Sequence, residues 1–229
     1  MNTQINITKN GTTTLATEGK YCDRNIDVNV NVDGGGEDVM AKLAQGTIEG
    51  EYASDEVLSL RTGAFCDCPN LTSVSLPNCT AFNGFRQFAN CTSITALNLP
   101  KLETITNGNQ NFASAESLEE INLPSLTTIS GSSATFNGCK NLSTVIMPLL
   151  SGSTIGASCF YNCYYLHTVV LGGETLNPLG NTNAFGNAGR NTELSIYVPD
   201  ALVDTYKAAT NWTAYADKIK PISELEGQG

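Results

Sequence analysis

The chain has 229 residues, of which 15% are charged, and a net charge of −10 at pH 7. Because it lacks a basic stripe that would neutralise phosphates, we expect it to bind neither nucleic acid nor an anionic membrane surface. Its first residues lack the basic and apolar segments of a secretory signal peptide, and its apolar runs are too short to span a bilayer. We therefore expect a chain that stays in the cell, leaves by a route that needs no signal, or is trimmed from a longer protein.

Residues 1–33 lie outside any repeat and alternate apolar with polar side chains in two places. Ile5 and Ile7 form one alternating run, and residues 26–32 form the other. The pattern predicts two strands joined by a longer loop, as a small β-hairpin module. Two strands alone are marginally stable, so we expect this module to form a homo-oligomer, to pair with another chain or to pack on the rest of the protein. Residues 34–46 predict a glycine-rich joint followed by a short helix.

A repeat of about two dozen residues follows an irregular first coil, which we predict for residues 47–60. Its clearest mark is a phenylalanine at spacings of 23, 24, 24, 24 and 25 residues: Phe65, Phe88, Phe112, Phe136, Phe160 and Phe185. A small residue follows three positions after each: Cys68, Cys91, Ala115, Cys139, Cys163 and Ala188. An aliphatic residue comes next: Leu71, Ile94, Leu118, Leu142 and Leu166.

Each repeat then contains an alternating apolar pair, which predicts a short strand with one face inward. The pairs are Val74/Leu76, Leu97/Leu99, Ile121/Leu123, Val145/Met147, Val169/Leu171 and Ile196/Val198. A proline, which cannot donate to a ladder, ends most of these strands. One repeat cannot bury its own apolar edge, but stacked repeats build a continuous core. We therefore predict a mainly β solenoid of about six coils of 23–25 residues over residues 47–199.

Residues 200–229 predict a helical cap and a tail. Asp200 is placed to cap the N-terminus of a helix, and Asn211 is expected to divide the segment into two short helices. Trp212 is predicted to plug the open end of the last coil. From Pro221 onward we expect a frayed tail.

Eight cysteines raise the alternatives of disulfides, metal ligands and buried thiols. Four of them share the small-residue column of the repeat, and alanine fills that column twice, so we favour buried free thiols. The pairs Cys66/Cys68 and Cys159/Cys163 lack the spacing of a zinc site, and we predict no bound metal.

A catalytic set is not evident in the sequence. The single histidine, His167, lies four residues after Cys163. A nucleophile pair of these two is disfavoured, because Cys163 should point inward and His167 outward. No glycine-rich loop follows the P-loop or dinucleotide pattern, and the carboxylates are scattered. We predict neither enzymatic activity nor a cofactor.

The outward residue of each strand forms a column that is polar at first and apolar later: Ser75, Asn98, Asn122, Ile146, Val170 and Tyr197. The fifth repeat adds three tyrosines on its turn. An exposed apolar and tyrosine-rich patch is typical of a contact surface. The candidate binding residues are Ile146, Val170, Tyr197, Tyr161, Tyr164, Tyr165, Asn98 and Asn122. The alternative is that the terminal helix or a neighbouring loop covers this column.

The repeat resembles the BspA-type leucine-rich repeat of bacterial surface proteins, over about residues 58–222. The resemblance is carried by Ala64-Phe65-x-x-Cys68-x-x-Leu71-x-x-Val74-x-Leu76-Pro77. It implies a leucine-rich-repeat solenoid that recognises a partner. The motif Ile5-x-Ile7-x-x-Asn10-Gly11-x-x-x-Leu15, with Tyr21 to Val30, resembles an opening segment of tail and baseplate proteins of phages that infect Firmicutes.

Together the two resemblances imply a non-enzymatic recognition or adhesion module. It would be located on a phage virion or displayed on a surface outside the cell, and would bind a protein or glycan on a cell surface. The alternative is the repeat domain of a bacterial cell-surface adhesin, cut from a longer exported chain.

Overall fold

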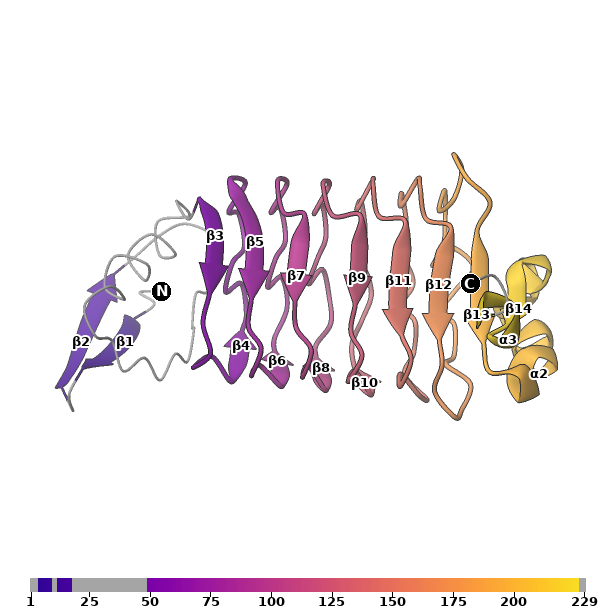
Figure 1. Cartoon of the computed structure of the whole chain (residues 1–229), viewed down its shortest axis with the longest axis horizontal. Helices are drawn as coiled ribbons and strands as arrows, with labels where there is room; N and C mark the ends of the chain where they lie inside the picture. The colour runs from indigo at the N-terminus through magenta and orange to yellow at the C-terminus, as the bar shows by residue number, and fades with distance from the viewer. Residues whose placement is uncertain (1–3, 10–11, 18–48, 227–229) are drawn as a thin grey trace.

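The computed structural model describes residues 4–9, 12–17 and 49–226 (Figure 1). Strands β1 (Gln4–Lys9) and β2 (Thr12–Thr17) form an antiparallel hairpin. The first strand therefore pairs with the segment directly after Asn10-Gly11, a pair of residues favoured in two-residue hairpin connections. Sequence analysis missed β2 because its threonines show no apolar alternation. The strand expected at residues 26–32 and the helix expected within residues 34–46 lie outside the described residues.

From residue 49 the chain winds into a solenoid whose coils contribute strands to two parallel rows (Figure 1). The first row holds β3 (Gly50–Ala53), β5 (Leu71–Ser75), β7 (Ala96–Asn98), β9 (Glu120–Asn122), β11 (Thr144–Met147), β12 (Thr168–Leu171), β13 (Ser195–Val198) and β14 (Ile219–Pro221). The second row holds β4 (Ser59–Arg61), β6 (Ala81–Asn83), β8 (Thr104–Thr106) and β10 (Thr128–Ile129). The ladder of the first row is interrupted between β7 and β9.

The predicted solenoid is confirmed, with about seven turns instead of six. The additional turn is the segment that was expected to be irregular, because β3 and β4 pair in parallel with β5 and β6. A bulge between Gly50 and Glu51 is the one irregularity of its register with β5. Tyr52 covers the open end of the core here, with its ring 5.2 Å from that of Phe65.

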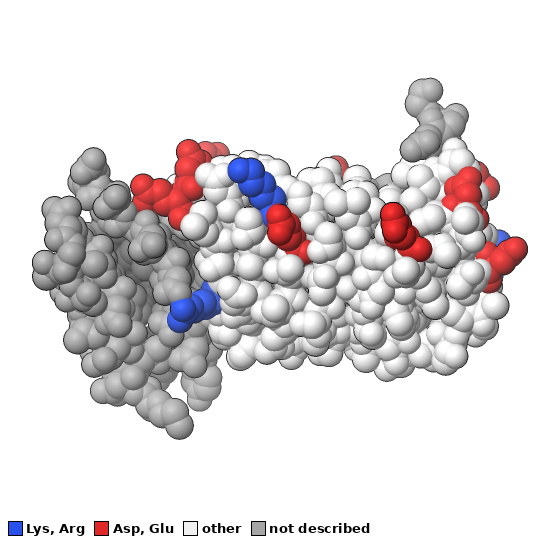
Figure 2. Space-filling model, turned by 90° about the horizontal axis from the view of Figure 1, so that it is seen from below, with Lys and Arg blue, Asp and Glu red and all other residues white. Residues whose placement is uncertain are grey.

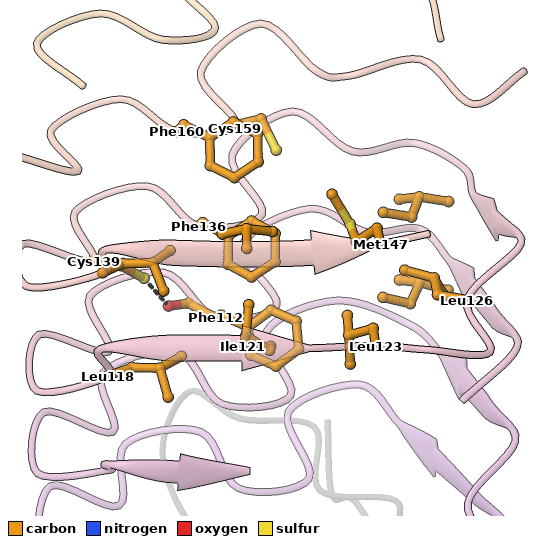
Figure 3. Packing of buried hydrophobic residues seen from close by; sticks show 14 of the residues in the cluster. Phe112, Leu118, Ile121, Leu123, Leu126, Phe136, Cys139, Met147, Cys159 and Phe160 are labelled. Atoms are coloured by element: carbon orange, nitrogen blue, oxygen red, sulfur yellow. Dashed lines mark hydrogen bonds between the residues drawn. The ribbon is translucent and has the colours of Figure 1, made fainter. Parts of the chain in front are cut away.

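The core is organised around the six phenylalanines, which stack face to face along the solenoid axis. Their ring centroids lie 5.0, 5.7, 5.0, 5.3 and 4.9 Å apart from Phe65 to Phe185. Aliphatic side chains of the first row pack beside the stack, as Figure 3 shows for Leu118, Ile121 and Leu123 around Phe112. Four of the five separations are close to the spacing of neighbouring strands, and the Phe88–Phe112 separation of 5.7 Å is wider.

The turn after each phenylalanine requires a left-handed backbone two residues later. This column has φ values between 56° and 74° and consists of Asp67, Asn90, Ser114, Gly138, Asn162 and Asn187. Asparagine, aspartate and glycine tolerate this conformation best, which explains their recurrence at one position of the repeat.

The C-terminal cap consists of η1 (Asp200–Leu202), α2 (Val203–Ala208), η2 (Trp212–Lys218), β14 and α3 (Ser223–Glu226). Asn211, at φ 66°, separates α2 from η2 as predicted. Trp212 is fully buried, with its ring 5.9 Å from Phe185 and 5.2 Å from Tyr206, so it closes the core as expected. Its indole Nε1 donates a hydrogen bond to the Asn177 carbonyl at 2.8 Å.

Two expectations about the cap were wrong. Asp200 lies inside the first turn of η1 and does not cap it; its carboxylate accepts a hydrogen bond from the backbone N–H of Ser223 at 3.2 Å. Hydrogen bonds from the side chain and then the backbone of Ser223 keep the pKa of Asp200 below its usual value. The residues from Pro221 to Glu226 are not a frayed tail, because β14 pairs with β13 and α3 follows it. Among the described residues, no helix is long and apolar enough to cross a bilayer.

Candidate functional site

The cysteine column is structural. The seven described cysteines are buried and none forms a disulfide. The thiols of Cys91, Cys139 and Cys163 each donate a hydrogen bond to the carbonyl of the phenylalanine one coil earlier, at 2.9, 3.0 and 3.1 Å. Burial raises the pKa of Cys139 and Cys159 to about 12, which suppresses the nucleophilic thiolate.

The potential nucleophile pair is not assembled. Cys163 points into the core and bonds to the Phe136 carbonyl, whereas His167 is exposed and its Nδ1 lies 2.8 Å from the Thr168 hydroxyl. Within the part of the chain that the structure describes, no group of three or more His, Cys, Asp or Glu side chains is placed to hold a metal ion.

The candidate strand face is exposed only in part. Asn98 and Asn122 are exposed and Ile146 is half-buried. Val170 and Tyr197 are buried, at 6% exposure each, so neither is part of the accessible candidate surface. The reason lies in the register: Val170 is flanked by Ile146 and Tyr197 on adjacent strands, and β14 continues the row so that Tyr197 has a neighbour on both sides.

The tyrosine turn, which we define as Tyr161, Tyr164, Tyr165 and Arg190, remains accessible. Tyr165 is 46% exposed, and the Arg190 guanidinium carbon lies 4.8 Å from the centre of the Tyr164 ring. That geometry is a cation–π contact. Tyr161 packs against Gly186, where a Cβ would lie 2.6 Å from its ring. Gly186 belongs to the next coil, so that coil holds the ring of Tyr161 in place.

Two polar contacts join neighbouring coils, one between the two coils that precede the tyrosine turn and one between its own coil and the next. Lys140 Nζ lies 2.9 Å from a carboxylate oxygen of Glu116, and Asn187 donates a hydrogen bond to Asn162 at 2.9 Å. These contacts join equivalent positions of neighbouring coils, so each side chain is ordered by its counterpart one coil away.

Comparison with known proteins decides the family. The model of the BspA type leucine-rich repeat region matches residues 58–192 with six copies, which is more than half of the chain. The protein belongs to the BspA-type leucine-rich repeat family. A crystal structure of a T. pallidum leucine-rich repeat protein is similar in fold, at 23% identity and a TM-score of 0.46, covering 68% of this chain and 80% of that one. A comparison with curated proteins gave no match.

In this BspA-type solenoid, the tyrosines of the candidate site were predicted from the sequence, but Arg190 was not. Arg190 lies outside the apolar columns, in the longer connection between Phe185 and β13, so no periodicity marks it. Arg190 contacts the Tyr164 ring although the two residues are 26 positions apart in the sequence, because they lie on adjacent coils. Three other exposed apolar side chains, Leu58, Phe85 and Leu149, were missed for a related reason: they occupy positions that hold polar residues in most other coils.

Proposed function

We propose that this solenoid is a non-enzymatic recognition module that binds a protein or a glycan displayed on a cell surface, and that the tyrosine turn is its contact surface. The observation that carries the proposal is the exposed Tyr165 beside Tyr164, whose ring is covered by Arg190. Tyrosine and arginine are enriched among the residues that dominate binding energy at interfaces. Tyrosine also loses little conformational entropy when it is immobilised.

The surroundings of the turn favour a partner recognised by stacking and hydrogen bonding. Residues 121–139 and 141–173 contain no Lys, Arg, Asp or Glu. Figure 2 shows a different face, seen from below in Figure 1 on the side of β4, β6, β8 and β10, and charged residues are few over the middle coils there as well. Such a surface steers no charged partner over a distance, but tyrosine, serine, asparagine and glycine supply adaptable contacts at short range.

Location on the outside of a cell, as in a bacterial adhesin, is part of the proposal and rests on the family. Location on a phage virion has narrower support, because the family model begins at residue 58 and does not include the segment that resembles phage proteins. Capsid or tail genes beside this gene would favour the virion, and an upstream export signal the adhesin. Oligomer formation through residues 1–33 is a separate part of the proposal, which light scattering that finds a monomer would contradict.

The proposal is tested with the double variant Tyr164→Ala/Tyr165→Ala and the control Leu149→Ala, which removes an exposed leucine from a different turn. The intact chain is applied to an array of immobilised glycans and to a library of displayed extracellular protein domains. Binding by the wild type and the control, with at least a ~10-fold loss in the double variant, supports the tyrosine turn as the contact. Equal binding by all three proteins would show that the contact lies elsewhere on the protein. If the wild type binds neither the glycans nor the protein domains, the proposed function is contradicted.

A further inference from the structure

The residue before each phenylalanine forms an interior column that includes two primary amides. The column consists of Ala64, Gln87, Asn111, Thr135, Cys159 and Ala184. Each of these residues after the first accepts a backbone hydrogen bond from the phenylalanine one coil earlier, at 2.7 or 2.8 Å. Gln87 and Asn111 are therefore in register on adjacent coils, and both are fully buried.

These two side chains have no hydrogen-bond partner among the described residues. Both polar atoms of each amide are unpaired, and four of the five unpaired buried side-chain atoms in this part of the chain belong to them. A buried amide without a partner costs roughly 1–3 kcal/mol, so native proteins pair such groups with protein or with ordered water. The next coil shows the usual solution: the Thr135 hydroxyl donates to the Gly108 carbonyl at 2.8 Å.

The ring stack and the first strand row are both less regular at this level. The Phe88 and Phe112 ring centres, 5.7 Å apart, are the most widely separated of the five stacked pairs. The strand row is interrupted between β7 and β9, which follow these two phenylalanines (Figure 1). The wider spacing and the unpaired amides therefore coincide at one junction between coils.

We infer that Gln87 and Asn111 form an internal hydration site, in which ordered water is bound between the two amides. The site supplies two acceptor oxygens and two amide nitrogens, and a buried water commonly makes about three hydrogen bonds. Water at this position satisfies both amides and adds a link between two coils whose first-row strands, β7 and β9, are not paired. The remaining column members need none, because alanine has no polar group to satisfy, Thr135 bonds to the backbone and the Cys159 thiol bonds to Thr135.

The direct test is solution NMR of the full chain, with the two side-chain NH₂ signals assigned from Gln87→Met and Asn111→Leu. Cross-relaxation between both NH₂ groups and a long-lived water is the expected result. Amide signals without such water contacts overturn the inference, whether the amides then bond to each other or remain unpaired. A high-resolution crystal structure showing a dry junction has the same consequence.

Thermal unfolding gives an independent readout. Gln87→Met and Asn111→Leu should each lower Tm by roughly 3–8 °C, because each removes one side of the site and leaves the other amide without its partner. The double variant removes all four polar atoms and should lose less than the sum of the two single variants. Thr135→Val, which deletes a hydrogen bond in the same column, is the reference. A rise in Tm in either single variant indicates amides buried without a ligand and contradicts the inference.

Discussion

The Cys139 thiol donates a hydrogen bond to the backbone carbonyl of Phe112, one coil earlier, with 3.0 Å between sulfur and oxygen (Figure 3). Both residues are fully buried. The bond crosses the boundary between two coils, as do those of Cys91 and Cys163, so these three cysteines of the column join successive turns of the solenoid in addition to filling space. This explains why a cysteine, and not only an alanine, occupies the position.

Cys139→Ala should destabilise the protein by more than Cys79→Ala does. Both changes remove one buried sulfur, but the bond of Cys139 across the coil boundary is short, at 3.0 Å. The Cys79 thiol lies 3.7 Å from the carbonyl of Ala81 in its own coil, and its bond to the Leu60 backbone one coil earlier is the lesser of the two. We expect the difference in the free energy of unfolding to be about 1 kcal/mol, the net worth of one hydrogen bond. Denaturant titration measures both variants, and equal losses would show that the thiol acts only by its volume.

Stability should fall as the pH rises above 9. The pKa of Cys139 and Cys159 is raised by burial from 9.0 to about 12 in the folded protein. Below pH 9 both thiols are protonated in either state, and their contribution is constant. Between pH 9 and 12 the unfolded chain releases protons that the folded chain retains, so unfolding becomes more favourable.

The control for the pH experiment is the double variant Cys139→Ala/Cys159→Ala, which keeps every other titrating group. Its free energy of unfolding should decline less steeply between pH 9 and 11 than that of the wild type. Parallel curves for the two proteins would mean that these thiols do not ionise differently on unfolding.

Trp212→Ala should cost about 3–5 kcal/mol, because a fully buried indole that closes the last coil is replaced by a cavity. Trp212→Phe retains an aromatic plug and should cost less, although it loses the hydrogen bond from Nε1 to the Asn177 carbonyl. Circular dichroism during urea unfolding measures both variants. If Trp212→Ala unfolds at the wild-type midpoint, the cap does not contribute to the stability of the solenoid.

Gly156→Ala should be among the most disruptive single-methyl additions to the solenoid. A Cβ at this glycine would lie 1.2 Å from the backbone oxygen of Ser132 in the preceding coil, so the two coils would have to separate. We expect a loss of roughly 3 kcal/mol or more. The comparison is Gly50→Ala, where a Cβ meets nothing within 4 Å and only the positive φ of 74° opposes the change. A similar, small loss at both positions would contradict the close approach.

The spacing of the apolar residues is enough to predict the solenoid, because a 24-residue period leaves few other ways to bury its apolar columns. Phe65 to Phe185, the small-residue column and the strand pairs were each predicted from spacing and were found stacked in the core. The plug at Trp212 followed from the same logic, since the last coil must be closed. Local rules failed where they were applied to single residues, as at Asp200, whose carboxylate bonds to a distant backbone N–H.

Which outward residues are accessible depends on how the coils stack and does not follow from the repeat. The spacing of the repeat places Val170 and Tyr197 on the outer face of their strands, yet neighbouring strands bury both. The contact between Tyr164 and Arg190 and the wider junction between Phe88 and Phe112 likewise depend on how coils stack. Periodicity specifies the position of a residue within its own coil. Exposure and pairing depend on the adjacent coils, whose distance and side chains the period does not specify.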